Sequence, residues 1–145
     1  MFKKILVPCD GSKLSHTAAE FAADLAKVHG ASVVGLYVID PFPYIGIGDA
    51  SSAGLQAYMA EAQAAASRAL NDVRSCCEAQ GVSFAGDTIE RNVTYEGILE
   101  TVGAEGCDLI VMGSHGRKGV QALILGSVAQ KVLTHAKVPV LIVKP

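Results

Sequence analysis

The sequence predicts an α/β fold in which helices cover both faces of a parallel sheet. Along the 145 residues, short apolar segments alternate with longer segments of helical periodicity, in the order β-α-β-α-β-α-β-α-β. The strongest strand segments, 3–9 and 107–113, each contain an uninterrupted apolar run, which is typical of strands buried on both faces. Right-handed crossovers between parallel strands then place helices on both faces of one sheet.

The first third of the chain predicts a strand, a helix and a second strand. The strand at 3–9 ends at Asp10, and the helix follows over 12–29 until Gly30 stops it. The next strand covers 31–40. The apolar residues of the helix recur at three- and four-residue spacing and predict its buried face: Leu14, Ala18, Phe21, Ala22, Leu25 and Val28. Three candidates compete for its amino-terminal cap: Ser12, Ser15, and a capping box of Thr17 with Glu20.

The remaining elements follow a Pro/Gly/Ser-rich segment at 41–54, which is typical of a binding loop or of a simple flexible connection. An alanine-rich helix is predicted next, at 55–80, with Tyr58, Ala62, Ala65, Ala69, Val73 and Cys76 on one face. Shorter elements complete the chain: a weak strand at 82–90, helices at 95–105 and 127–136, the strand at 107–113, and a last strand at 138–143. Gly86 indicates an edge or a bulge in the weak strand, and Pro139 an edge position for the last one.

Composition limits the class of protein. Half of the residues are hydrophobic, the formal net charge is −2 and the isoelectric point is near 6.0, which argues against a surface built for nucleic acid. No stretch approaches the ~20 apolar residues of a membrane span, and the apolar opening is too short for a signal peptide. We therefore expect one cytoplasmic domain over 1–145. The four cysteines form no C-x-x-C pair and show no zinc spacing with the histidines, which favours reduced thiols over redox sensing or metal binding.

The predicted architecture locates a ligand site. In open parallel sheets, ligands bind beyond the carboxyl ends of the strands, where the strand order reverses. Two polar loops follow the strongest strands at this position: "PCDGS" at 8–12 and "GSHGRKG" at 113–119.

The second loop has the chemistry of an anion site. Gly113 and Gly116 flank a Ser-His pair directly after a strand, and Gly126-Ser127 opens the last helix. A helix amino terminus offers unpaired N–H groups and partial positive charge, and glycine lets a phosphate come close. Arg117 and Lys118 add positive charge, so the segment suits a polyphosphate. The chain has no G-x-x-x-x-G-K-[ST] motif, so this is no P-loop.

The spacing Gly113-x-x-Gly116, nine residues, Gly126-Ser127 resembles the nucleotide-binding signature of the ATP-binding branch of the universal stress protein family. The resemblance extends to "KKILVPCDGS" at the start, "LYVID" in the second strand, "DLIVMGSHGR" in the fourth and "VPVLIVKP" at the end. It implies an open five-stranded parallel sheet in the order 3-2-1-4-5, Rossmann-like and similar to the adenine nucleotide alpha hydrolases. It also implies a homodimer through the last strand, Val138 to Val143.

The resemblance further implies a role for each matching residue. Pro8 and Asp10 lie at the mouth of the first strand, with Asp10 near the ribose and phosphates or on a magnesium ion. Val38 contacts adenine. The ribose and phosphate side is lined by residues of the second loop and the strand before it: Met112, Gly113, His115, Gly116 and Arg117. The phosphates are held at the start of the last helix by Gly126, Ser127 and Val128. The expected ligands are thus ATP and Mg²⁺. Cys9 departs from the family pattern, where a hydrophobic residue is common, and we expect it to pack as a small hydrophobe.

Several of these residues also have an interpretation without a ligand. Asp10 is then a turn or cap residue, His115 is a solvated loop residue, and Arg117-Lys118 is an ordinary basic loop. The favoured function is an ATP-dependent regulatory or stress-response module whose occupancy changes the segments 41–54 and 114–125. The residues support slow ATP hydrolysis or self-phosphorylation at most, because no second acidic residue is placed near Asp10. The alternatives are a dimeric docking module without a nucleotide site and a redox adaptor using Cys76 or Cys77.

Overall fold

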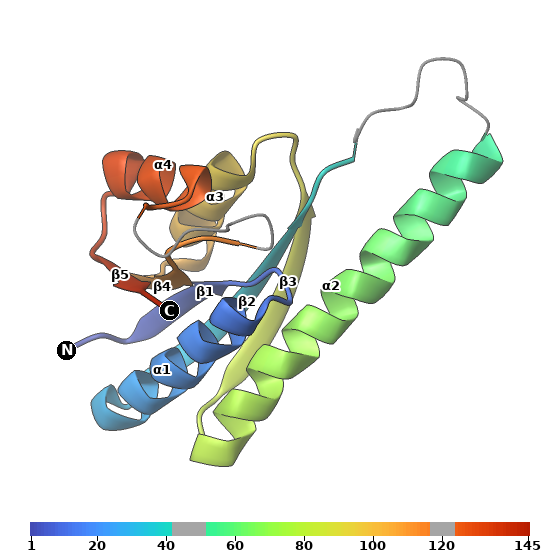
Figure 1. The fold of residues 1–145 in the computed structure, drawn as a ribbon. Coiled ribbons are helices and arrows are strands. Elements are labelled where there is room, and N and C mark those ends of the chain that lie inside the picture. Colours follow the sequence, from blue (N-terminus) through green and yellow to red (C-terminus); the bar gives the residue numbers. More distant parts are fainter. Residues whose placement is uncertain (42–51, 117–123) are drawn as a thin grey trace.

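The chain folds around one open parallel sheet (Figure 1). The structure is a computed structural model and describes residues 1–41, 52–116 and 124–145. Within these residues the strands are β1 (Lys4–Pro8), β2 (Ser32–Ile39), β3 (Phe84–Glu90), β4 (Leu109–Gly113) and β5 (Val140–Val143). Their order in the sheet is β3-β2-β1-β4-β5, and every neighbouring pair is parallel. The predicted fold class and strand order are therefore confirmed.

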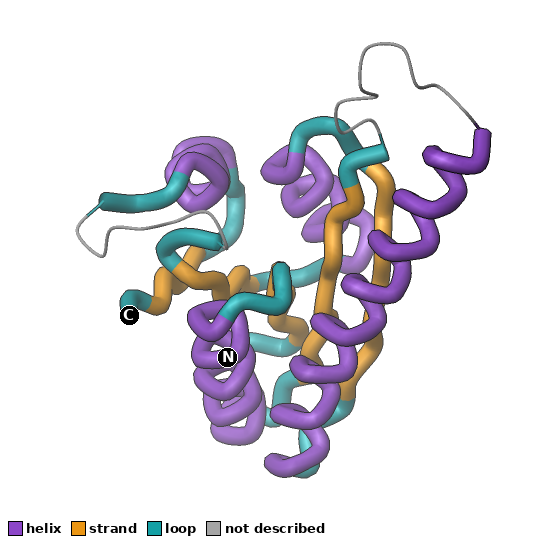
Figure 2. The backbone as a smooth tube through the Cα atoms, turned by 45° about the vertical axis from the view of Figure 1, so that its right-hand side comes forward, coloured by secondary structure: helices purple, strands orange, loops and turns teal. Residues whose placement is uncertain are grey.

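Helices cover both faces of the sheet (Figure 2). They are α1 (Lys13–His29), α2 (Ser52–Gln80), α3 (Thr94–Glu105) and α4 (Ser127–His135). Because successive side chains of a strand point to opposite faces, β1 divides its apolar residues between two cores. Ile5 and Val7 pack with α1 and α2, whereas Leu6 packs with α3 and α4. All three side chains are fully buried, as predicted for a strand covered on both faces.

The buried face of α1 agrees with the predicted one at Ala18 and Ala22 and differs from it at Phe21 and Val28. Phe21 and Val28 are 49% and 81% exposed, so the prediction that they point inward is wrong. The face that meets the sheet consists of small residues instead: Ser15, Ala18, Ala19, Ala22, Ala23 and Ala26. Small side chains let the helix axis come close to both the sheet and α2, a contact that the spacing of the large apolar residues does not reveal. Ser12 is the cap, because its side chain accepts a hydrogen bond from the N–H of Ser15, and the Thr17–Glu20 capping box is not used.

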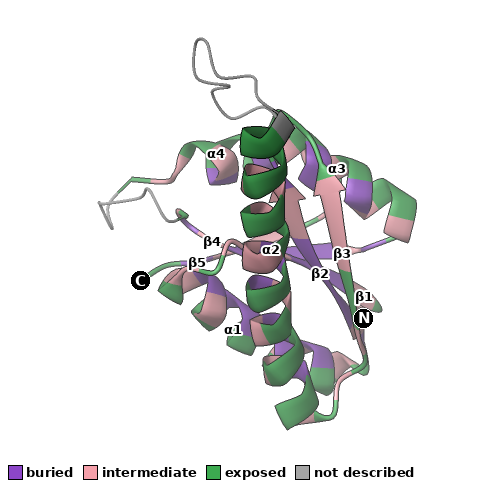
Figure 3. Cartoon of the chain, turned by 90° about the vertical axis from the view of Figure 1, so that its right-hand side faces the viewer, coloured by how far each residue is buried: buried purple, intermediate pink, exposed green. Residues whose placement is uncertain are grey.

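Helix α2 is longer than the sheet that it covers. Its buried residues, Ala66, Ala69, Val73 and Cys77, lie in the second half of the helix. Residues 53–57 are exposed, and this end of α2 extends beyond the strands (Figure 3). The predicted face at 58–76 is correct at Ala69 and Val73. The larger part of the 41–54 segment, residues 42–51, lies outside the described residues.

The two edges of the sheet are β3 and β5, as predicted from Gly86 and Pro139. The register between β2 and β3 is continuous from Val33↔Phe84 to Ile39↔Glu90, so no bulge accompanies Gly86. None of the helices within the described residues is long and apolar enough to cross a membrane.

Candidate functional site

The turn after β1 is held by a short chain of hydrogen bonds. The backbone N–H of Ser12 donates to Oδ1 of Asp10 at 2.9 Å, and the N–H of Asp10 donates to Oγ of Ser15 at 3.2 Å. The N–H of Ser15 in turn donates to Oγ of Ser12 at 3.2 Å. Asp10 therefore acts as a turn residue, and the same bonds fix the direction of its carboxylate at the carboxyl end of β1.

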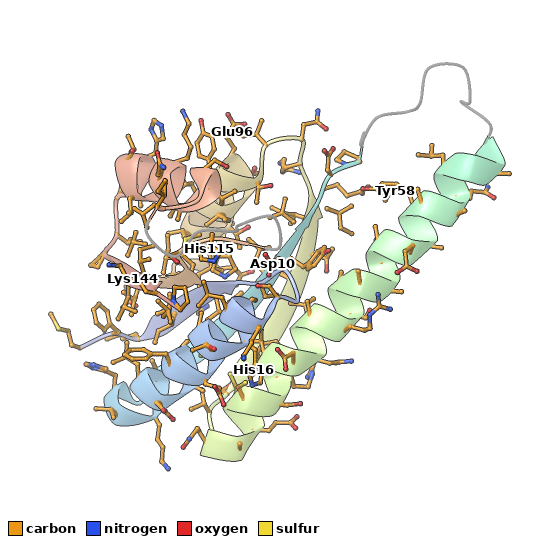
Figure 4. The ribbon with its side chains drawn as sticks, viewed as in Figure 1. Asp10, His16, Tyr58, Glu96, His115 and Lys144 are labelled. Carbon is orange, nitrogen blue, oxygen red and sulfur yellow. The ribbon has the colours of Figure 1, made fainter. Side chains whose placement is uncertain are left out.

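The loop after β4 lies beside this turn, and Asp10 and His115 lie near each other at the carboxyl end of the sheet, where both line one cavity (Figure 4). The N–H of Ser114 donates to the carbonyl of Val143 at 2.9 Å, which continues the pairing of β4 with β5. The Ser114 side chain is 2% exposed, and its Oγ lies 3.1 Å from Nδ1 of His115. The histidine ring thus has a fixed partner on one nitrogen and does not behave as a freely solvated side chain.

Helix α4 begins at Gly126, which is in contact with the same loop. The N–H of Gly126 donates to the carbonyl of Ser114 at 2.7 Å. Gly126, the N-cap residue, has no side chain that could accept from the first N–H groups of the helix, and the first turn of α4 carries no acidic residue. The amino-terminal N–H groups of α4 therefore keep their capacity to bind an anion, and the helix dipole adds partial positive charge there.

These three segments enclose a cavity of about 540 Å³. Its volume lies within the range of small-molecule sites. Each described residue that the sequence nominated lines it: Pro8, Asp10, Val38, Met112, Gly113, His115, Gly116, Gly126, Ser127 and Val128. Arg117, the remaining nominated residue, and Lys118 lie outside the described residues. Residues that are more than 100 positions apart in the sequence thus come together where β1 and β4 adjoin.

The cavity has two chemically different ends. Between β2 and α3 its wall is apolar and includes Leu36, Val38 and Ile98. Helix α3 comes close to β2 here because Gly97 has no side chain: a Cβ at Gly97 would lie 3.3 Å from Cγ2 of Val38. Between β4 and α4 the wall includes three glycines, which leave backbone groups accessible, and the polar residues His115 and Ser127. One end therefore suits a flat apolar ring and the other an anion.

Some cavity residues have no strong signal in the sequence. Ser15, Tyr37, Thr94 and Ile98 line the cavity although each sits in a regular helix or strand pattern that predicts structure alone. Thr94 is the first residue of α3, and its position after the carboxyl end of β3 is the one signal in the sequence that favours a place in the cavity wall. Cys9 also lines the cavity, and its Sγ lies 3.4 Å from the carbonyl oxygen of Leu36. Burial, followed by the nearby Asp10 charge, raises the pKa of the Cys9 thiol to about 12, so it packs as a neutral group.

A second polar group joins α1 to α2 outside the cavity. Nδ1 of His16 lies 2.7 Å from Oδ1 of Asp72, and its Nε2 lies 3.6 Å from Glu20. The Sγ of Cys76 is 3.9 Å from the same Nδ1. The described residues contain no group of three or more acidic, histidine or cysteine side chains arranged to hold a metal ion. This group is therefore an interhelical contact.

An open doubly wound sheet with a cavity at its switch point defines a class of ligand-binding α/β domains. Comparison with known proteins identifies the family within that class. The profile of the universal stress protein family matches residues 1–144, and this chain belongs to that family. Universal stress protein MJ0531 of Methanocaldococcus jannaschii is 36% identical over 144 residues, which cover 99% of this chain and 83% of that protein.

Solved structures show the same fold. MJ0577 of the same organism superimposes with a TM-score of 0.84 at 26% identity, and the match covers 100% of this chain and 97% of that one. A universal stress protein in complex with cAMP matches with a TM-score of 0.69 at 21% identity, covering 98% of this chain and 96% of that one. A universal stress protein of Archaeoglobus fulgidus in complex with dAMP matches with a TM-score of 0.70 at 19% identity, covering 98% and 97% of the two chains.

Proposed function

We propose that residues 1–145 form one nucleotide-binding domain that holds ATP in the cavity between β1, β4 and α4. A single observation carries the proposal: the residues nominated from the sequence line one cavity whose ends differ in chemistry as the ends of a nucleotide do. Two proteins of the same fold have structures in complex with cAMP and with dAMP, and both ligands are adenine nucleotides. The chemistry of the cavity thus agrees with the ligands that these relatives hold.

The direction of the nucleotide follows from the two ends. Adenine takes the apolar end, where Val38 closes the carboxyl end of β2 and its backbone supplies hydrogen bonds. The phosphates take the end formed by Gly126, Ser127 and Val128, where the helix amino terminus stabilises negative charge. Asp10 lies between the two ends, beside Gly116 and His115. We therefore expect its carboxylate next to the ribose and the first phosphates, and we expect Arg117 to contribute positive charge to phosphate binding.

A magnesium ion fits this arrangement as part of the nucleotide. Asp10 is the one carboxylate among the described residues that line the cavity. Magnesium is commonly held by one or two carboxylates together with substrate phosphates and water, so one protein oxygen is sufficient when a triphosphate supplies the others. Bound magnesium would neutralise phosphate charge next to Asp10. We therefore assign Asp10 as the protein ligand of Mg-ATP.

The site supports binding better than turnover. Phosphoryl transfer needs positioned metal ions and a group that orients the nucleophile, and Asp10 has no acidic neighbour in the described cavity wall. Ser114 is buried and hydrogen-bonded to His115, so Ser127, which lines the cavity, is the better acceptor for slow self-phosphorylation. We infer a nucleotide-dependent regulatory module of the cytoplasm, with ATP hydrolysis at most very slow.

The test starts from protein purified without added nucleotide. Denaturation followed by mass spectrometry identifies any ligand carried through purification, and calorimetric titration with Mg-ATP then measures affinity. Released ATP or a dissociation constant in the micromolar range supports the proposal. If the purified protein releases no nucleotide and binds neither ATP, ADP nor AMP, the proposal is overturned and a docking module of the same fold is favoured.

We also propose a homodimer through the last strand segment, Val138 to Val143. Strand β5 is an edge of the sheet and its sequence is apolar, so it offers unpaired backbone groups to a second copy. Sedimentation velocity across a concentration series measures this directly. A chain that remains monomeric at every concentration contradicts the dimer without affecting the nucleotide site.

A further inference from the structure

We propose that Asp10 is a positioning residue for the loop after β4, and that residue 116 is glycine because the Asp10 carboxylate occupies the place of its side chain. The sequence motif suggests another reason for this glycine, namely the close approach of a phosphate. The structure favours a protein group as the neighbour. The binding part of the test rests on the proposed function, whereas the stability part does not.

The geometry begins with the direction of the carboxylate. Oδ1 of Asp10 accepts the N–H of Ser12 at 2.9 Å, which holds the side chain over the mouth of β1. The other oxygen, Oδ2, then faces the loop after β4. An ideal Cβ built on Gly116 would lie 2.5 Å from Oδ2 and 3.7 Å from Cγ of Asp10. Real Cβ atoms essentially never come within 3.0 Å of a neighbour, so alanine at 116 requires either Asp10 or the loop to move.

Backbone conformation does not explain this glycine. The φ angle of Gly116 lies outside the left-handed region, unlike that of Gly30 or Gly106. An alanine is therefore compatible with the backbone itself, and the obstacle is the contact with Asp10. This makes the requirement conditional, since a shorter side chain at position 10 removes it.

The other side of the loop is equally close to the protein. A Cβ on Gly126 would lie 3.1 Å from both Cα and Cβ of His115 and 3.2 Å from the carbonyl oxygen of Ser114. The N–H of Gly126 donates to that same carbonyl at 2.7 Å. Residues 114–116 are thus held between Asp10 at the end of β1 and Gly126 at the start of α4.

This arrangement has a consequence for ligand binding. Two glycines of the family signature, Gly116 and Gly126, lie against protein atoms, so contacts within the protein help to hold the loop in position. A ligand that enters a preformed cavity spends less free energy on ordering the protein, which raises its affinity. Asp10 therefore contributes to binding twice, as a contact of the nucleotide and as the support of the loop.

A double-mutant cycle separates the two explanations. It compares the wild type, Gly116→Ala, Asp10→Ala and the double variant D10A/G116A. The matched controls are D10N and D10N/G116A, because asparagine removes the charge of Asp10 but keeps its size. Each protein is measured by thermal unfolding without nucleotide and by calorimetric titration with Mg-ATP.

We expect G116A alone to lower the melting temperature by about 4 °C and to weaken Mg-ATP binding about tenfold. In the D10A background, the added G116A should change either quantity by less than a third of that amount. In the D10N background, the full loss of melting temperature should return, because the amide is as large as the carboxylate.

An unchanged melting temperature in G116A overturns the proposal, as does an equal loss in all three backgrounds. A binding loss that is equal with and without Asp10 indicates that the ligand, and not Asp10, requires the glycine. If the wild type binds no nucleotide, the proposed function fails, but the unfolding cycle still decides the role of Asp10. The failure of either proposal is therefore recognised separately.

Discussion

The two ends of the sheet use glycine for different physical reasons. At the amino end of the strands, Gly30 ends α1 with φ +65, and a Cβ there would meet nothing within 4 Å. At the carboxyl end, Gly116 and Gly126 have no positive φ, yet a Cβ on either would press against neighbouring protein atoms. At the amino end, Gly30 needs a left-handed backbone conformation, and a side chain there would have room. At the carboxyl end, Gly116 and Gly126 have ordinary backbone conformations, and a side chain there would have no room.

The difference predicts how each end responds to substitution. A left-handed glycine in open surroundings loses only conformational energy when a side chain is added. A crowded glycine transmits the new volume to its neighbours, and here those neighbours are the walls of the cavity. Substitution at the amino end should therefore change stability alone, whereas substitution at the carboxyl end should change stability and binding together.

The largest effect is expected for Gly126→Val. Its Cβ would lie 3.1 Å from the backbone of His115, and its branches would fill the place that we assign to the phosphates. We expect loss of measurable Mg-ATP binding and a decrease of about 2 kcal/mol in the free energy of unfolding. Calorimetry and urea denaturation measure the two quantities. Wild-type affinity in this variant would show that the phosphate assignment is wrong.

A matched control is available in α3. Gly103 lies in a helix, and a Cβ there would meet nothing within 4 Å. Gly103→Val introduces the same side chain without a contact, so its effect on the free energy of unfolding should stay within about 0.5 kcal/mol. Its affinity for Mg-ATP should equal that of the wild type.

The next effect concerns the carboxylate at the crowded end. Asp10→Ala should weaken ATP binding about tenfold in the presence of magnesium and much less in its absence, because the metal links the carboxylate to the phosphates. Calorimetry with and without a chelator measures both values. Asp24→Ala, on the exposed side of α1, controls for the change in net charge. An equal loss under both conditions would contradict the magnesium role and leave contact with the ribose or support of the loop after β4 as the contribution of Asp10.

The carboxyl end could be predicted from the sequence more fully than the helix faces. The strand order follows from the resemblance to the universal stress protein family. The positions of Asp10 and Gly113 follow from motifs that stand directly after apolar segments, and that of Gly126 from the start of the last helix. In α1, Ala18 and Ala22 are buried as predicted, whereas Phe21 and Val28, which were predicted on the same buried face, are exposed. Periodicity weights large apolar residues, whereas this helix packs through alanines, whose hydrophobic signal is weak although they allow the closest approach.

The physical reason why a motif position needs its particular residue is harder to predict than the position itself. The spacing of Gly116 and Gly126 indicates an anion site, and both residues do line the cavity. That Asp10 and His115 are the atoms nearest to them depends on contacts between segments far apart in the sequence. The exposed first turns of α2 likewise depend on where the sheet ends, which the alanine-rich pattern of 55–80 does not specify.

A smaller effect is expected at the open end of the sheet. Gly30→Ala forces alanine into the left-handed conformation that closes α1, at a cost of about 1 kcal/mol in the free energy of unfolding. Nothing else is displaced, and the cavity lies at the opposite end of the strands, so Mg-ATP affinity should not change. Urea denaturation and calorimetry measure the pair. An affinity change above about threefold would contradict the separation of the two ends.

The smallest effect is expected at the contact that joins α1, whose first turn supports Asp10, to α2. The hydrogen bond with Asp72, 2.7 Å from Nδ1, and the nearby Glu20 raise the pKa of His16 above its ordinary value of 6.5. A raised pKa means that protonated His16 stabilises the folded chain. This stabilisation is complete below about pH 6.5 and is lost as the pH rises through the folded-state pKa. Because both side chains are more than a third exposed, its size should stay below about 1 kcal/mol.

Urea denaturation across this pH range, on the wild type and on His16→Gln, isolates the contribution. The difference in unfolding free energy between the two proteins should be largest at the acidic end and should shrink toward about pH 8. Asp72→Asn should reduce the same pH dependence, since it removes the charge that favours protonation. Mg-ATP affinity should be the same in all three proteins, because His16 lies outside the cavity wall. If the difference in unfolding free energy between the wild type and His16→Gln grew with rising pH, the ion pair of His16 with Asp72 would not be its cause.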